Sequence, residues 1–141
     1  MKIIVATDKF KGSLTSFEAC KAIVEGIIMA DKNAEVIELP MADGGDGFAT
    51  VLEYPLGRSV SAGYQWDVNT KTAIIEMAVA SGLVLLKDEE RNPLLTSTFG
   101  TGLLIKQAIE KGAEKIILGL GGSATNDGGT GILSALAFQL V

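Results

Sequence analysis

Two dense clusters of glycine, each at the end of an apolar run, constrain the fold of this chain more than any other feature of its sequence. One cluster lies within residues 44–47 and the other within residues 119–129. Glycine makes up 17 of the 141 residues, against a usual share of about 7%. In α/β proteins, glycine-rich loops follow buried strands and lead into helices, so this spacing predicts an α/β fold.

The first part of the chain has the pattern of a parallel β-α-β unit. Residues 2–7 form a short apolar run rich in β-branched side chains, which predicts a strand buried on both faces, and residues 34–39 are predicted as a second strand. Between them, Thr15 and Glu18 have the spacing of a capping box, which predicts a helix from there to about Ala30. Because such connections strongly prefer a right-handed parallel crossover, we predict a Rossmann-like parallel sheet.

The rest of the chain departs from this pattern. A helix is expected over residues 46–54. Residues 59–67 and 72–77 are strand-like and joined by a short turn, which predicts an antiparallel hairpin. Three further elements are predicted from periodicity and caps: a helix from Thr98 to Gly112, a parallel strand at residues 113–120, and an apolar helix from Thr130 to the end of the chain.

These elements predict two domains. Residues 1–54 would form the first part of a discontinuous Rossmann-like α/β domain, and residues 55–141 the start of a second α/β domain. The last residues are apolar and have neither a helix cap nor a polar tail. We therefore expect an incomplete chain.

The composition excludes several kinds of chemistry. The chain has no histidine, so proton transfer falls to carboxylates, lysine, tyrosine or water, and Ser-His-Asp triads and HExxH zinc sites are excluded. Its 12 basic and 17 acidic residues give a net charge of −5, which argues against nucleic acid as a partner. No segment approaches the ~20 consecutive apolar residues of a membrane span. The single Cys20 and the lack of a signal-peptide pattern predict a cytoplasmic location.

The longest glycine-rich loop, residues 119–129, is the strongest candidate for a ligand site. Adjacent glycines leave backbone N–H groups free to converge on phosphate oxygens, and the loop follows a predicted strand, at the sheet edge where ligands usually bind. Ser123, Thr125 and Asn126 add neutral hydrogen-bonding groups. Asp127 could hold a metal ion or accept a proton, or it could only cap the following helix.

The same loop fits the dinucleotide pattern GxGxxA through Gly119, Gly121 and Ala124, which raises a nicotinamide-dependent oxidoreductase as an alternative. In that fingerprint the helix begins inside the glycine motif. Here the predicted helix begins several residues later, so the match is weak.

Charged residues at two other predicted loops suit an anionic substrate and a metal ion. In the loop after residue 42, Asp46 is expected to cap a helix, whereas Asp43 could act as a general base or Mg²⁺ ligand. The loop after the first strand offers a carboxylate, ammonium groups and a hydroxyl from Asp8, Lys9, Lys11 and Ser13. The guanidinium group of Arg91 could form a bidentate pair with a carboxylate.

Seven motifs follow one another along the chain: Lys-Phe-Lys-Gly-Ser at 9–13, Pro-Met-Ala-Asp-Gly-Gly-Asp-Gly at 40–47, Pro-Leu-Gly-Arg at 55–58, Ile-Glu-Met-Ala at 75–78, Arg-Asn-Pro at 91–93, Thr-Phe-Gly-Thr-Gly at 98–102, and Gly-Gly-Ser-Ala-Thr-Asn-Asp-Gly-Gly at 121–129. In this order they strongly resemble the bacterial glycerate kinase type I family. Lys9 departs from that family, whose first loop commonly has serine at this position.

The resemblance implies ATP-dependent phosphorylation of D-glycerate, giving 2-phosphoglycerate and ADP, with Mg²⁺. The leading hypothesis is transfer in a cleft between two α/β domains. Cationic groups would hold the glycerate carboxylate, backbone amides of residues 121–123 would hold phosphate, and Asp43 or Asp127 would bind Mg²⁺ or take the hydroxyl proton. The candidates are catalytic Asp43, Asp127 and Lys11; substrate-binding Asp8, Lys11, Ser13 and Arg91; cofactor-binding Gly121, Gly122, Ser123, Thr125 and Asn126; and metal-binding Asp43 and Asp127.

Family members are longer than this chain in two places. They continue past the Asn-Asp-Gly-Gly motif and carry additional residues before Pro-Leu-Gly-Arg, so the join between Tyr54 and Pro55 is a candidate site of missing residues. The expected partner is the small molecule glycerate, and a homodimer is one expected assembly. A noncatalytic fragment of the kinase is the remaining alternative.

Overall fold

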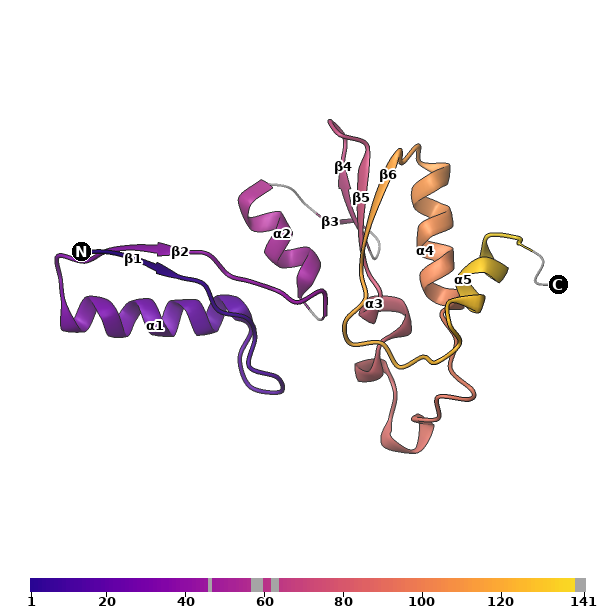
Figure 1. The fold of residues 1–141 in the computed structure, drawn as a ribbon, viewed down its shortest axis with the longest axis horizontal. Helices are drawn as coiled ribbons and strands as arrows, with labels where there is room; N and C mark the ends of the chain where they lie inside the picture. Colours follow the sequence, from indigo (N-terminus) through magenta and orange to yellow (C-terminus); the bar gives the residue numbers. More distant parts are fainter. Residues whose placement is uncertain (46, 57–59, 62–63, 139–141) are drawn as a thin grey trace. The chain divides into compact units, whose positions relative to one another are not determined.

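The computed structural model describes residues 1–45, 47–56, 60–61 and 64–138, with the backbone alone at 53–56 and 60–61 (Figure 1). The described chain combines parallel and antiparallel strands with helices, which confirms the predicted α/β class. It divides into two compact units, residues 1–43 and residues 44–141. The division falls before the second helix, whereas the sequence places a domain boundary after it; that boundary stays a prediction.

The first unit is a parallel β-α-β unit, as predicted. Strand β1 (Lys2–Val5) pairs in parallel with β2 (Glu35–Glu38), and helix α1 (Ser16–Ala30) connects them. The capping box is present, because Thr15 Oγ1 accepts from the Glu18 amide at 3.2 Å and Glu18 Oε2 accepts from the Thr15 amide at 2.8 Å. These reciprocal bonds fix the start of α1.

The small core of this unit lies between α1 and one face of the two-stranded sheet. Val5, Cys20 and Val24 are buried there. On the other face, Ile4 is 60% exposed and Ile37 is 38% exposed. The expectation of a first strand buried on both faces is therefore wrong for this unit, because α1 covers one face only.

The second unit contains a four-stranded sheet in the order β3-β4-β5-β6. Its strands are β3 (Val60–Ser61), β4 (Tyr64–Asp67), β5 (Thr72–Glu76) and β6 (Lys115–Gly119). Strand β4 pairs with β5 in antiparallel register, which confirms the predicted hairpin, and β6 pairs with β5 in parallel. The part of the predicted strand at residues 59 and 62–63 lies outside the described residues.

The second unit also contains helices α2 to α5, which Figure 1 labels. They are α2 (Phe48–Leu56), α3 (Ala78–Ser81), α4 (Phe99–Glu110) and α5 (Thr130–Ala135), with 3-10 turns at Leu83–Leu85 and Asp88–Glu90. The core packs α4 onto the sheet through Tyr64, Ala73, Ile75, Ile105 and Ala108. No helix of the described ranges is long and apolar enough to cross a bilayer.

One helix end that the sequence predicts is confirmed, and another is wrong. Gly112 follows α4 with a φ of +93°, which confirms the predicted glycine cap. The apolar helix predicted from Thr130 to the end of the chain is shorter: α5 ends at Ala135, and Ala137 takes a φ of +64°. This left-handed residue breaks the helical repeat. Residues 139–141 lie outside the described part, as does Asp46, the predicted cap of α2.

Candidate functional site

The loop formed by residues 119–129 is held along its first half by backbone hydrogen bonds to the segment that follows β5. The Gly119 carbonyl accepts from the Met77 amide at 2.9 Å, and the Gly122 carbonyl accepts from the Leu83 amide at 2.9 Å. The Ala124 amide donates to the Ser81 carbonyl at 2.9 Å. Because β5 and β6 are parallel, these contacts lie at the carboxyl edge of the sheet, where the sequence places a ligand site.

The two glycine clusters meet backbone to backbone within the second unit. The Gly121 amide donates to the Gly44 carbonyl at 2.8 Å. A Cβ atom on Gly121 would lie 2.4 Å from the Gly45 nitrogen, and one on Gly119 would lie 2.8 Å from the Gly44 oxygen. Glycine is therefore required at both positions by close approach, a contact that the sequence analysis did not predict.

Two amides of the predicted phosphate loop stay available. The Gly121 amide is committed to Gly44, but the Gly122 and Ser123 amides donate no hydrogen bond within the described part of the chain. Ser123 Oγ lies 2.8 Å from Thr125 Oγ1, and it also accepts from the Thr125 amide at 3.1 Å. Asn126 lies exposed beside them. The geometry thus brings together the predicted cofactor-binding residues of this loop, with Gly122 and Ser123 as its available backbone donors.

Asp127 fastens the second half of the loop. Its carboxylate accepts five hydrogen bonds, from Ser97 Oγ at 3.2 Å, the Thr98 amide at 2.8 Å, Thr98 Oγ1 at 2.9 Å, the Gly129 amide at 3.2 Å and the Gly131 amide at 3.1 Å. Partial burial acts to raise the pKa of Asp127, but the bonds from Thr98 and the two glycine amides outweigh it and lower the pKa to about 2. Asp127 is a structural anchor in this geometry.

Ser97 and Thr98, which hold Asp127, were missed as site residues by the sequence analysis. Thr98 is buried, and its hydroxyl also accepts from the Ile132 amide at 3.1 Å. The available signal was the motif at residues 98–102, which occurs in the resemblance but carries no charged group. A hydroxyl group whose role is to hold a carboxylate in place cannot be recognised from composition or periodicity.

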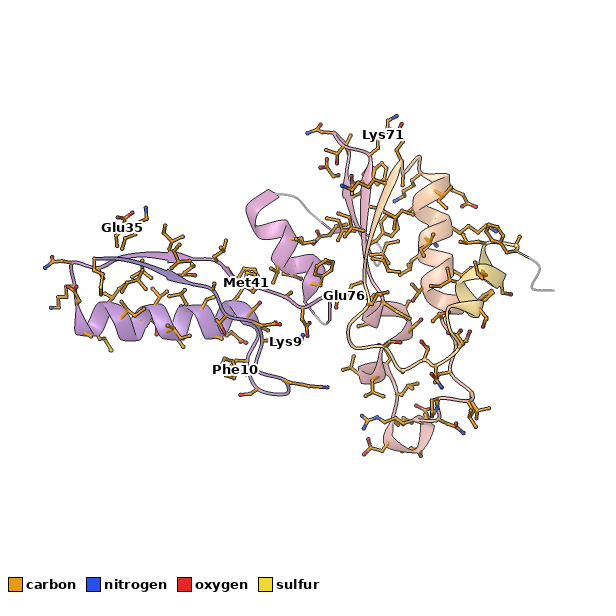
Figure 2. All side chains as sticks on the ribbon, viewed as in Figure 1. Lys9, Phe10, Glu35, Met41, Lys71 and Glu76 are labelled. Carbon is orange, nitrogen blue, oxygen red and sulfur yellow. The ribbon has the colours of Figure 1, made fainter. Side chains whose placement is uncertain are left out.

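Glu76 was also missed as a site residue, although it lies in the motif at residues 75–78. It ends β5, is only 7% exposed, and accepts from the Gly47 amide at 2.9 Å and the Ala49 amide at 3.3 Å (Figure 2). A single acidic residue within the apolar run at residues 73–78 was the signal that could have revealed it.

In the first unit, the loop after β1 is a tight turn that carries several of the predicted substrate-binding residues. The Leu14 amide donates to the Phe10 carbonyl at 3.0 Å, and Gly12 takes a φ of +74°. Lys11 and Ser13 are exposed on this turn. Asp8 Oδ1 accepts from the Lys9 amide at 2.6 Å. The turn therefore presents a cation and a hydroxyl to solvent.

Lys9 and Asp43 form an ion pair in the same unit, with Lys9 Nζ 3.3 Å from Asp43 Oδ1. The Lys9 side chain is 20% exposed and that of Asp43 is 67% exposed. The residue that departs from the family pattern thus contacts the carboxylate predicted as a base or metal ligand. Figure 2 labels Lys9.

Arg91 is exposed and directly follows the 3-10 turn at Asp88–Glu90. Its Nη1 atom is 2.6 Å from Asp88 Oδ1. The guanidinium group therefore forms a local ion pair, and the structure joins it to none of the other predicted site residues among those described.

Asp43 and Asp127 are the two carboxylates that the sequence analysis predicted as Mg²⁺ ligands. The described residues contain no group of three or more acidic, cysteine or histidine side chains that could hold a metal ion. Mg²⁺ usually keeps several waters and binds through one or two carboxylates together with substrate phosphates. Asp43 is exposed and paired with Lys9, whereas the carboxylate of Asp127 accepts hydrogen bonds at both oxygens.

The dinucleotide alternative receives no support from the geometry. Helix α5 begins at Thr130, well beyond Ala124. The GxGxxA residues therefore lie at the end of β6 and in the loop ahead of the helix, whereas the fingerprint requires the helix to begin within the motif.

The structure defines an α/β protein with an anchored glycine-rich loop at the carboxyl edge of its four-stranded sheet. The sequence matches the model of the glycerate kinase family over residues 3–141, and the chain belongs to this family. It is 48% identical to a glycerate kinase from Haemophilus influenzae over 99% of its own length, and 44% identical to a glycerate 2-kinase from Escherichia coli K12 over 99%.

A crystal structure of a Salmonella typhimurium LT2 protein assigned as glycerate kinase 2 has the same fold. It is 41% identical, with a TM-score of 0.71 over 96% of this chain. The chain spans only 40% of that protein and 40% of each of the two relatives. The alignment with the Haemophilus influenzae protein extends over 152 positions, more than the 141 residues of this chain, so that relative carries inserted residues. The Tyr54–Pro55 join stays the predicted place for them.

Proposed function

We propose that the complete protein transfers the γ-phosphoryl group of ATP to D-glycerate and releases 2-phosphoglycerate and ADP. Membership of the glycerate kinase family supports a kinase acting on glycerate. The single observation that carries the proposal for this chain is the anchored loop at residues 119–129, whose Gly122 and Ser123 amides have no acceptor among the described residues at the carboxyl edge of the sheet. Phosphoryl transfer depends mainly on such positioned donors.

Phosphate oxygens would bind to the Gly122 and Ser123 amides. Gly121 would act indirectly, because its amide holds the Gly44 carbonyl. The hydroxyls of Ser123 and Thr125 and the side-chain amide of Asn126 would add neutral hydrogen bonds. The fixed loop reduces the entropy lost when the nucleotide is positioned.

The glycerate carboxylate would be held by cationic and hydroxyl groups. Lys11 and Ser13 suit this role because they are exposed on a tight turn, with Asp8 at the base of the turn. Arg91 would exchange its Asp88 partner for the substrate carboxylate, since a guanidinium group binds carboxylates in bidentate geometry.

We propose that Asp43, and not Asp127, is the carboxylate that acts on the reacting groups, by accepting the hydroxyl proton or by binding Mg²⁺. In the transfer, the substrate hydroxyl oxygen forms a bond to the γ-phosphorus, the bond from that phosphorus to the bridging β,γ-oxygen breaks, and the hydroxyl proton passes to a carboxylate. A pKa near 2 and five hydrogen bonds make Asp127 a poor acceptor for this proton. Mg²⁺, when bound at Asp43, would supply charge neutralisation for the phosphate oxygens.

The test is ADP release by the purified complete protein with Mg²⁺, ATP and either D- or L-glycerate. We expect release that depends on D-glycerate and falls at least tenfold with the L-enantiomer, together with an intact mass well above 14.7 kDa. ADP release that is unaffected by glycerate would contradict the proposed substrate.

A further inference from the structure

The buried carboxylate of Glu76 has no part in the chemistry proposed above. Glu76 lies at the carboxyl end of β5, where its neighbours Ile75 and Met77 are also buried. Burying a charged carboxylate is costly unless hydrogen bonds compensate for the lost hydration. Its partners therefore indicate what the residue does.

Those partners are backbone amides at the beginning of α2. Glu76 Oε1 accepts from the Gly47 amide and Oε2 accepts from the Ala49 amide. The first amides of a helix have no partner within the helix, and a negative charge is favourable at this end. On β4, the side-chain amide of Gln65 donates to the Ala49 carbonyl. The two strands thus hold the first turn of α2.

The same turn is held at its other end by the glycine-rich loop. The Gly44 carbonyl accepts from Gly121, and Glu76 pairs with Gly119 in the register of β5 and β6. Gly44 is therefore fastened by the glycine-rich loop, and Gly47 and Ala49 are fastened by Glu76. Gly47 completes the turn with a φ of +87°.

We propose that Glu76 is a positioning residue for phosphoryl transfer, which fixes the beginning of α2 next to the contact of Gly44 with the glycine-rich loop. This inference rests on the proposed function. Displacing a reacting group by about 1 Å can lower a rate by about 100-fold. Loosening the turn would then lower kcat, while the groups that hold the glycerate carboxylate keep its KM nearly unchanged.

Two pairs of variants of the complete protein test this proposal. Glu76→Gln keeps the size of the side chain but replaces one acceptor oxygen with a donor facing an amide, and Glu110→Gln makes the same change at an exposed position of α4. Gly47→Ala strains the turn without touching the core, because no described atom beyond its chain neighbours lies within 4 Å of the added Cβ. Gly112→Ala imposes the same strain in the same open surroundings at the end of α4.

Hydrogen exchange of the amides at residues 44–52 and steady-state kinetics are then compared. We expect at least tenfold faster exchange in this segment for Glu76→Gln and Gly47→Ala, at least a tenfold lower kcat, and a glycerate KM within about threefold. The two controls, Glu110→Gln and Gly112→Ala, should change neither the exchange rate of this segment nor kcat by more than twofold.

Unchanged exchange in both test variants would overturn the positioning role, and so would faster exchange with an unchanged kcat. If Glu76→Gln does not fold, the result with Gly47→Ala decides. Complete absence of glycerate phosphorylation in the unaltered protein would overturn the proposed function instead, and hydrogen exchange would still show whether Glu76 fixes the turn.

Discussion

The amide of Gly121 donates a hydrogen bond to the carbonyl of Gly44 across 2.8 Å, and this bond joins the two glycine clusters of the sequence. The approach is so close that neither backbone leaves room for a side chain at Gly121. The two clusters are therefore parts of one structural arrangement, although they lie far apart in the sequence.

Replacing Gly121 with alanine should separate these loops. The added Cβ would lie 2.4 Å from the Gly45 nitrogen, and such overpacking typically costs about 1–3 kcal/mol. We expect that loss in the free energy of unfolding, measured in urea, together with at least a tenfold lower kcat. Gly26→Ala is the control, because its Cβ meets nothing within 4 Å inside α1. Equal stability of Gly121→Ala and the unaltered protein would contradict the close approach.

Replacing Asp127 with asparagine should loosen the connection between the loop, Thr98 and the start of α5. The side-chain amide would place a donor against the donors that Asp127 now accepts. Hydrogen bonds to a charged group are worth about 1.5–3 kcal/mol each in favourable cases, so we expect a loss of at least about 1.5 kcal/mol by thermal unfolding. Asp88→Asn, in an exposed ion pair, should cost less than about 1 kcal/mol.

The lowered pKa of Asp127 gives stability a defined dependence on pH. Its pKa falls from an ordinary 3.8 to about 2 in the folded chain. Because the folded pKa is the lower one, the carboxylate contributes fully above about pH 4, and the contribution is lost as pH falls towards 2. The loss of unfolding free energy between pH 5 and pH 3 should be smaller in Asp127→Asn than in the unaltered protein. An identical loss in both would contradict the shift.

Lys9 should affect the dependence of activity on Mg²⁺. Its ammonium group lies 3.3 Å from Asp43 Oδ1, so it opposes a divalent cation at that carboxylate. In Lys9→Ser we expect half-maximal activity at a Mg²⁺ concentration roughly two- to fivefold lower, the range of an exposed ion pair worth up to about 1 kcal/mol. Lys32→Ser, at an exposed position in the same unit, is the control. An unchanged Mg²⁺ dependence would argue against Asp43 as a ligand.

Features set by residues close in sequence were predictable. The capping box at Thr15 and Glu18, the β4–β5 hairpin and the glycine after α4 all depend on spacings of a few residues, and all three are confirmed. The β-α-β unit followed from the handedness of short connections.

Features that depend on distant parts of the chain were not predictable from one sequence. The contact of Gly44 with Gly121, the capping of α2 by Glu76 and the anchoring of Asp127 by Thr98 arise only when strands and loops pack together. The exposure of Ile4 likewise depends on which elements cover the sheet, whereas its apolar character alone predicted burial. The end of α5 was missed because an apolar sequence does not reveal a left-handed residue such as Ala137.

The most direct test of the central claim is the phosphorus NMR spectrum of the products formed by the complete protein from D-glycerate, ATP and Mg²⁺. We expect equal amounts of ADP and a phosphomonoester on carbon 2 of glycerate. A phosphomonoester on carbon 3 would contradict the proposed product, and the absence of any phosphorylated glycerate would contradict glycerate kinase activity itself.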